Sequence, residues 1–402
     1  MTASSASAPV AAGSDRRRTL GVACGAHALH DGFTDLIYVL LPIWQAQFSL
    51  GYAQVGALRA LYAGTTAAFQ VPAGVLAERT GARMVLAAGT ALAALGYLLA
   101  GASAGFAMLA VALVVGGLGS SVQHPVASSL VAHAFDGHRS RAALGTYNFA
   151  GDLGKMALPA LTALLVAWIT WRPAVTVLGL AGLAGAAAVL LLVPRPAPRE
   201  AAGATGTATA DAAPAAGRGG FPVLLSIGMI DSATRMGFLT FLPFLLQGKG
   251  ASLPTVGVAL TLVFAGGAAG KLACGFLGER FGVLRTVWLT EGMTAVGIVS
   301  LLALPLAPSL AILPMVGLAL NGTSSVLYGT VPELVSRERR ARAFGVFYTA
   351  TIGAGALAPV FYGLFSDALG VPAMMKLIAA VVLVTLPLAW LLRNALAPAP
   401  AA

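Results

Sequence analysis

Ionisable side chains in the first apolar segment of the chain have a spacing that could support proton transfer. His27, Asp31 and Asp35 recur at intervals of four residues, so a helix would place them on one face. His30 lies beside them. A carboxyl group in a dry cavity can bind and release protons near neutral pH, because desolvation disfavours its charged form. We therefore expect Asp31 and Asp35 to take part in proton movement, with His27 or His30 as a relay.

A basic residue stands at the equivalent position of a second apolar segment. Asp231 and Arg235 have the same four-residue spacing, and Arg235 lies 200 residues after Asp35. A guanidinium stays charged and presents a planar fork that suits a carboxylate or a phosphonate. Arg59 and Lys271 could add positive potential. These bases predict a small anionic or zwitterionic ligand.

A lipophilic cation would instead need acidic groups and aromatic rings around it. The aromatic residues expected at a cavity, such as Tyr38, Tyr62 and Tyr328, do not form a dense cage.

Other ionisable or polar residues fall within apolar segments, where such residues usually face a cavity. Each has a simpler alternative. Asp152 and Lys155 are one helical turn apart and could neutralise each other. His124 precedes a proline and could bond a freed carbonyl. For Glu291, structural pairing is the better interpretation.

We expect Asp152 to join the proton-coupling group. The expected ligand-binding residues are Tyr38, Arg59, Gln123, His124, Lys155, Asp231, Arg235, Lys271, Asn321 and Tyr328.

The composition requires a membrane protein. Of 402 residues, 58% are hydrophobic and 9% are charged, whereas soluble domains carry about 25% charged residues. Apolar runs near the ~20-residue length of a bilayer-spanning helix recur along the chain. We predict an all-α membrane protein with twelve helices, over 20–47, 53–77, 84–102, 106–134, 142–168, 174–193, 220–247, 253–278, 286–305, 310–334, 343–369 and 373–393.

The two halves of the chain repeat each other. Asp31 and Asp231, and Pro159 and Pro359, are each 200 residues apart. A duplicated apolar half is how many secondary transporters are built. We therefore predict two pseudo-symmetric six-helix bundles over 20–193 and 220–393, a linker over 194–219 that is rich in Pro, Ala, Gly and Thr, and tails over 1–19 and 394–402.

The formal charge of +10 does not predict a nucleic-acid partner. Most of the Lys and Arg residues fall in the N-terminal tail, in alternate loops, in the linker and near the C-terminus. This asymmetry follows the positive-inside rule. It predicts that both termini and the linker are cytoplasmic, and that the charge orients the protein in a bacterial inner membrane.

A charged turn occurs once in each half. Gly74 to Arg83 and Gly275 to Arg285 each contain an acid-Arg pair, a glycine and a further arginine. The glycine permits a tight turn, and the acid can pair with an arginine or cap the next helix. Such a turn could latch the halves together in one state, or it could be a positively charged turn without a gating role. The expected gating residues are Glu78, Arg79, Gly81, Arg83, Glu279, Arg280, Gly282 and Arg285.

These turns resemble the loop signature of the major facilitator superfamily, with Glu where that signature normally has Asp. The resemblance covers Leu20 to Arg393. His27 to Gly32, together with Ser120 to Pro125, is similar to the fosmidomycin-resistance group of drug exporters. The Gly-x-x-x-Gly-Pro run of antiporters is approximated only loosely by Gly151 to Pro159. The resemblance implies that helices 1, 4, 7 and 10 line a cavity.

We expect a monomeric, proton-coupled secondary transporter that works by alternating access and exports a small organic anion or drug. The alternative is an uptake symporter for a carboxylate-type nutrient. An enzyme or receptor would require a nucleophile–base set, metal-ligand spacing or an appended soluble domain, and the sequence has none of these. It also has no Walker motif. No metal or cofactor is expected.

Overall fold

The computed structural model describes residues 13–135, 137–194, 220–336 and 339–396. These residues are predominantly helical and contain no strand, as the sequence predicts. Most of the predicted linker over 194–219 and the ends of both tails lie outside the described residues.

The first half contains α1 (Gly13–Phe48), α2 (Tyr52–Thr80), α3 (Ala82–Gly101), α4 (Phe106–Ser120), the π-helical turn η1 (Gln123–Ala127), α5 (Ser128–Ala134), α6 (Gly137–Ile169) and α7 (Trp171–Leu192). Helix α1 begins at Gly13, so residues 13–19 belong to a helix and not to the predicted tail. The single helix predicted over 106–134 is interrupted at η1, which contains Pro125. Proline has no amide hydrogen and clashes with the carbonyl four residues earlier, which explains the interruption.

The second half contains α8 (Gly220–Gly248), α9 (Leu253–Ala303), α10 (Leu306–Leu334), α11 (Arg340–Leu369), α12 (Val371–Leu383) and α13 (Thr385–Leu396). The helices predicted over 253–278 and 286–305 both lie in α9, where Gly282 breaks the helical backbone with a φ of 80°. Gly81 has a φ of 96° at the equivalent turn of the first half. Both glycines therefore provide the left-handed conformation that the charged turns require.

Eight helices of the described chain are long and apolar enough to cross a membrane. Helices α1, α2 and α8 are not among them, and they carry ionisable residues that are buried inside the protein, including Asp35, Arg59 and Asp231.

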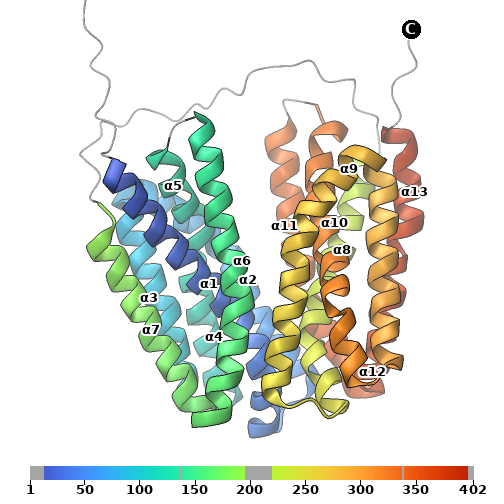
Figure 1. The fold of residues 1–402 in the computed structure, drawn as a ribbon, viewed down its shortest axis with the longest axis horizontal. Coiled ribbons are helices and arrows are strands. Elements are labelled where there is room, and N and C mark those ends of the chain that lie inside the picture. The colour runs from blue at the N-terminus through green and yellow to red at the C-terminus, as the bar shows by residue number, and fades with distance from the viewer. Residues whose placement is uncertain (1–12, 136, 195–219, 337–338, 397–402) are drawn as a thin grey trace, which may run out of the picture.

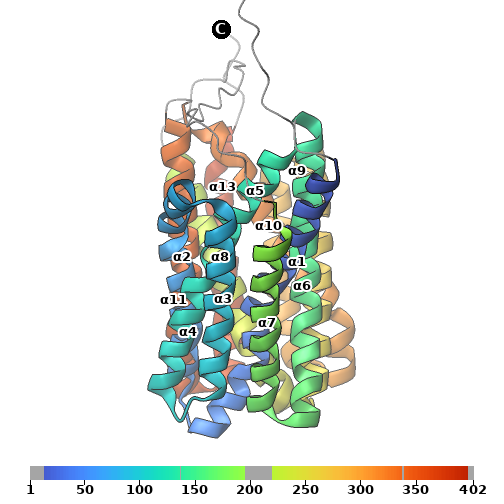
Figure 2. The same cartoon turned by 90° about the vertical axis from the view of Figure 1, so that its left-hand side faces the viewer.

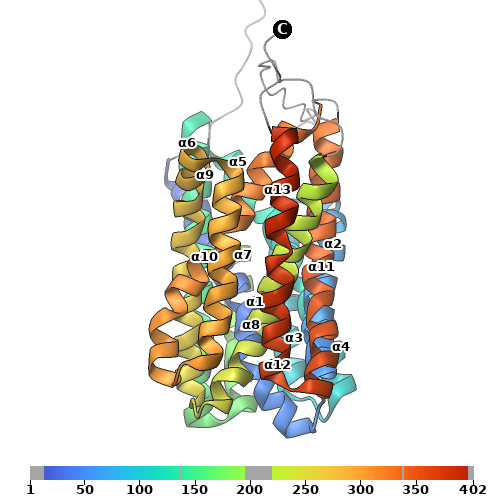
Figure 3. The ribbon, with the colours of Figure 1, turned by 90° about the vertical axis from the view of Figure 1, so that its right-hand side faces the viewer.

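The two halves form two bundles that stand side by side (Figure 1). Figure 2 views the molecule from the side of the first bundle, and Figure 3 from the side of the second. We call the end at which α1 begins and α13 ends the terminal end. The opposite end, where α1 ends and α2 begins, is the far end.

At the far end the second half caps a helix of the first. The carboxylate of Asp367 accepts hydrogen bonds from the backbone amides of Tyr52 and Ala53, at 2.6 and 2.9 Å. These amides open α2, whose N-cap residue, Gly51, has no side chain to satisfy them. The negative charge also suits the positive end of the helix dipole. Small residues allow close contact nearby, because a Cβ added at Gly56 would lie 2.0 Å from the carbonyl oxygen of Pro359.

The apolar cores show that the halves are joined at one end only. One cluster of buried residues is continuous across both halves at the far end and includes Trp44, Phe241 and Met375. At the terminal end each half has its own cluster, around Val131 in the first and Val331 in the second. The halves therefore pack together at the far end and are separate at the terminal end (Figure 1).

Replacing Asp367 with alanine should loosen the far end. Loss of a helix N-cap costs about 0.5–2 kcal/mol, which changes a two-state ratio by up to roughly 30-fold. Spin labels at Ala102 and Ala307, which are exposed at the far end of each half, should report a longer-distance population that is small or missing in the unmodified protein.

The matched control is Ser366→Ala, because the Ser366 hydroxyl bonds only within its own helix, to the carbonyl of Tyr362. An identical distance distribution in Asp367→Ala and Ser366→Ala would contradict the role given to the cap.

Candidate functional site

Ionisable side chains from both halves line one cavity of about 580 Å³ between the bundles. The four-residue spacing places Asp31 and Asp35 on one face of α1, and Asp231 and Arg235 on one face of α8. Twelve of the residues expected from the sequence line this cavity: Asp31, Asp35, Tyr38, Arg59, His124, Asp152, Lys155, Asp231, Arg235, Lys271, Asn321 and Tyr328.

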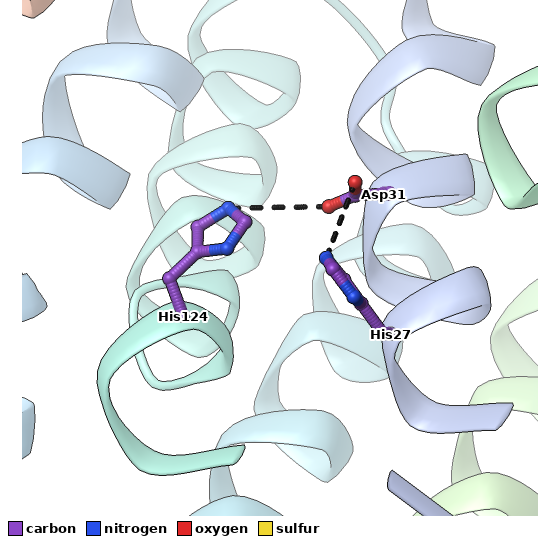
Figure 4. A group of neighbouring side chains, drawn as sticks. All are labelled: His27, Asp31 and His124. Carbon is purple, nitrogen blue, oxygen red and sulfur yellow. Dashed lines mark ion pairs between the residues drawn. The ribbon is translucent and has the colours of Figure 1, made fainter. Parts of the chain in front are cut away.

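Asp31 is the centre of a group of basic side chains in the first half. Its carboxylate lies 3.3 Å from Lys155 Nζ and 3.4 Å from His27 Nε2. His124 approaches from η1, with its Nε2 4.0 Å from the other carboxylate oxygen (Figure 4). Asp31 is therefore an ionised carboxylate held by a lysine from α6, with two histidines beside it.

The His27 ring is held in one orientation. Its Nδ1 lies 2.8 Å from the Tyr147 carbonyl and its ring stacks on that of Tyr147, with centroids 4.1 Å apart. A carbonyl can only accept, so Nδ1 carries a proton and Nε2 is directed at Asp31. His27 is buried behind Asp31 and does not line the cavity.

The same three side chains could in principle hold a metal ion. Ligand atoms of His27, Asp31 and His124 lie within 4.8 Å of one another (Figure 4), and zinc takes nitrogen and carboxylate ligands. However, Lys155 already contacts the Asp31 carboxylate at 3.3 Å. A metal ion would be repelled there, so the contact with Lys155 disfavours a metal site.

Asp35 is in a different situation from Asp31. It is 6% exposed and makes no hydrogen bond or ion pair with any residue that the structure describes. Arg59, which is 2% exposed, donates only to the Tyr38 hydroxyl, at 3.0 Å, and its Nε and one terminal nitrogen have no partner. An acid and a base are thus both buried in the first half without an ionic partner. Such groups are costly in a low-dielectric interior.

An ion pair joins the two halves across the cavity. Lys271 Nζ of α9 lies 2.6 Å from Asp152 Oδ1 of α6. The alternative in which Asp152 and Lys155 neutralise each other is wrong, because Lys155 pairs with Asp31 and Asp152 with Lys271. The packing of α1 and α9 against α6 offers both groups closer partners than their neighbours on the same helix.

Arg235 makes only long polar contacts with its neighbours. One terminal nitrogen lies 3.9 Å from Asp231 Oδ2, and the other donates to the Ser324 hydroxyl of α10 at 3.4 Å. Both distances are long for charge-assisted hydrogen bonds. The guanidinium lines the cavity and therefore keeps donors available for a ligand. Asn321 lines the same wall, with its amide bonded to the Gly317 carbonyl of its own helix.

Besides His27, three residues expected at the cavity lie elsewhere. His30 Nε2 contacts Thr90 of α3 at 2.9 Å, and the Gln123 amide donates to the Tyr147 hydroxyl at 3.0 Å. Tyr62 bonds the Ser120 hydroxyl at 2.6 Å. All three are buried within the first half, because they project from the sides of α1, η1 and α2 that pack against neighbouring helices.

The sequence analysis missed several lining residues. The expected Tyr328 has aromatic neighbours that were not expected: its ring centroid lies 4.9 Å from that of Phe344, 5.3 Å from that of Tyr348 and 6.4 Å from that of Phe347. Tyr328, Phe347 and Tyr348 line the cavity, so it is more aromatic than expected. The only available signal was the repeat, which pairs Phe347 with Tyr147. The missed polar lining residues are Thr34, Thr66, Gln70, Ser232, Ser324, Ser325 and Thr351.

The charged turns lie at the terminal end. Arg83 donates to the Leu190 carbonyl, and Arg280 stacks over Phe281 at 5.8 Å. Glu78 and Glu279 are at the protein surface. Within the described residues, none of the polar contacts of these turns bridges the two halves, so no latch is formed in this conformation.

Comparisons with known proteins agree with this architecture. The family model of the Major Facilitator Superfamily matches residues 23–222 and 223–402. The fosmidomycin resistance protein of Escherichia coli (strain K12) is 29% identical over 164 residues, which are 40% of each chain. MdtD of Cronobacter sakazakii, named for multidrug resistance, is 29% identical over 161 residues, which are 40% of this chain and 34% of that protein. The matches thus span less than half the length of these relatives.

Solved structures share the fold over nearly the whole chain. A bacterial homologue of the human lysosomal transporter Spinster has a TM-score of 0.80 at 17% identity, covering 97% of this chain and 100% of that one. The nucleoside transporter NupG has a TM-score of 0.78 at 11% identity, covering 94% and 100%. Because the family model covers both halves, the chain belongs to the Major Facilitator Superfamily.

Proposed function

We propose that this protein is a proton-coupled secondary transporter that exports a small organic anion or drug across a bacterial inner membrane by alternating access. The proposal includes twelve membrane spans in two six-helix bundles, over 20–193 and 220–393, with both termini cytoplasmic. The family and the names of the two curated relatives support export. A cavity lined by titratable groups from both halves supports transport coupled to protons.

One observation carries the proton coupling: Asp35 is buried at the cavity without an ionic partner, whereas Asp31 is held by Lys155 and His27. A buried carboxyl group that lacks a partner favours its neutral form. Asp35 would therefore carry a proton into this conformation and release it to the cytoplasm when a cationic group, from a substrate or from Arg59, comes close enough to stabilise its ionised form. Asp31 and His27 provide a relay beside it.

The two ends of the molecule support alternating access. With the termini in the cytoplasm, the separated terminal ends make this the inward-facing state. Opening the far end would require release of the Asp367 cap and separation of the shared core. The charged turns around Glu78 and Glu279 would then meet and form the latch that is absent here.

The charge of the substrate determines the direction of coupling. The cationic group of a zwitterion would compete with the proton for Asp35, which produces exchange and hence export. Its anionic group would bind Arg235 and the neighbouring Ser324. A ligand with both charges therefore fits an exporter best.

An uptake symporter for a carboxylate-type nutrient is the second candidate. Its supporting observation is the contact of Arg235 with Asp231 at 3.9 Å. Protonation of Asp231 would free Arg235 for an anion, so that proton and anion bind together and move in the same direction. Counterflow in oriented vesicles with an imposed pH gradient separates the candidates. A proton gradient directed into right-side-out vesicles, with acid outside, drives an exported substrate out and a symported substrate in.

Replacing Asp35 with asparagine should abolish proton-driven transport and leave folding intact, because the amide keeps the shape of the side chain and cannot bind the proton. Transport should be measured in proteoliposomes with and without a pH gradient, and folding by thermal unfolding of the purified protein.

The matched control is Glu333→Gln, an exposed carboxyl group at the end of α10 outside the cavity, which should transport normally. Full proton-driven flux in Asp35→Asn would remove Asp35 from the coupling role.

Replacing Arg235 with alanine should selectively weaken the binding of anionic ligands. Hydrogen bonds to charged groups contribute about 1.5–3 kcal/mol, so affinity should fall about tenfold or more for a carboxylate or phosphonate and change little for a neutral analogue. Arg235→Lys keeps the charge without the planar fork and should recover part of the loss. Equal affinities of Arg235→Ala and the unmodified protein for charged and neutral ligands, measured by calorimetry, would refute this role.

A further inference from the structure

The apolar surface of the cavity lies on one side only. Every lining residue that the first half contributes carries a polar or charged group. The described lining residues with apolar side chains all belong to the second half: Met236, Leu239, Phe264, Ala268, Leu327, Phe347 and Ile352. A ligand in the cavity therefore has an apolar wall available on the side of the second half.

Two tyrosine rings in this wall are not covered by protein. Tyr328 of α10 is 41% exposed and Tyr348 of α11 is 49% exposed, and both line the cavity. Their ring centroids are 5.3 Å apart, with an angle of 83° between the ring planes. Neither hydroxyl forms a hydrogen bond with a residue that the structure describes. Rings that only filled the space between α10 and α11 would be covered, so these rings are available to a ligand.

The internal repeat shows that the fold does not require these rings. The residues 200 positions earlier are Ser128 and Asn148, and neither of them lines the cavity. The first half does supply Tyr38 to the lining, but that side chain is buried and accepts a hydrogen bond from Arg59. Among the described lining residues, exposed tyrosine rings therefore occur only in the second half.

The tyrosines lie close to the proposed anion-binding group. Arg235 donates to the Ser324 hydroxyl at 3.4 Å, and Ser324 precedes Tyr328 by four residues on α10. Side chains at this spacing share one helix face, with their Cβ atoms about 5–6 Å apart. Both residues line the cavity with Arg235. A ligand bound to Arg235 through its anionic group therefore has its next few atoms beside the Tyr328 ring.

We infer that the cavity binds an anion that carries an aromatic ring, with the charge at Arg235 and the ring against Tyr328 and Tyr348. The inference rests on the proposed anion-binding function and specifies the substrate as an arylalkyl carboxylate or phosphonate. Each ring–ring contact favours binding by about two- to tenfold beyond the effect of the area buried. The carboxylates of the first half remain free on the opposite side for a proton or a cationic substituent.

Competition binding to the purified full-length chain tests the ring contact. The probe is radiolabelled 3-phenylpropionate, and the competitors are propionate and 3-cyclohexylpropionate. We expect propionate to bind about tenfold or more weakly than the probe, because it has no ring to bury.

Tyr328→Leu keeps an apolar side chain but removes the ring. It should lower the affinity for the phenyl compound about two- to tenfold and leave that for the cyclohexyl compound nearly unchanged. Tyr328→Phe keeps the ring and should retain the preference. The matched control is Phe361→Leu, because Phe361 is exposed on α11 outside the cavity, and it should bind both compounds normally.

Three results would overturn the inference: no saturable binding of the probe, equal affinities for propionate and 3-phenylpropionate, or equal losses for the phenyl and cyclohexyl compounds in Tyr328→Leu. The uncharged 3-phenylpropanamide separates this inference from the anion-binding proposal. An amide that binds as tightly as the carboxylate, and depends on Tyr328, would refute the role of Arg235 and leave the ring contact in place.

Discussion

The free-energy cost of placing charged groups in a membrane interior is the constraint on which this structure depends. Each of α1, α2, α6, α8 and α9 contributes ionisable side chains to one cavity, where they can contact one another or water. Some are neutralised completely, as in the 2.6 Å contact between Asp152 and Lys271. Others, such as Asp35 and Arg59, are left without ionic partners. These two groups could form ion pairs in a second conformation.

The same constraint explains why the halves meet at one end. At the far end a continuous apolar core and the Asp367 cap join them without any buried charge between them. Toward the terminal end each half has its own apolar core, and no apolar core joins the two halves. Opening of the far end in the proposed transport cycle would require these contacts to be released together.

Much of the fold and part of the site were predictable from the sequence. Apolar runs and the 200-residue repeat indicate the helices and the two halves, and the four-residue spacing on α1 and α8 identifies Asp31, Asp35, Asp231 and Arg235 as cavity residues. Pairing was not predictable, because it depends on how helices pack. Lys155 bonds Asp31 rather than its neighbour Asp152, and Gln123 faces Tyr147. No spacing within one helix carries that information.

The central claim is that this cavity is reached from opposite ends in turn. A single cysteine at Ala268, which lines the cavity, in a chain whose Cys24 and Cys274 are replaced by serine, can be labelled with a membrane-impermeant thiol reagent in right-side-out and inside-out vesicles. The account predicts labelling from the terminal end at rest and from the far end when a proton gradient is imposed. Labelling from one side only, with and without the gradient, would contradict it.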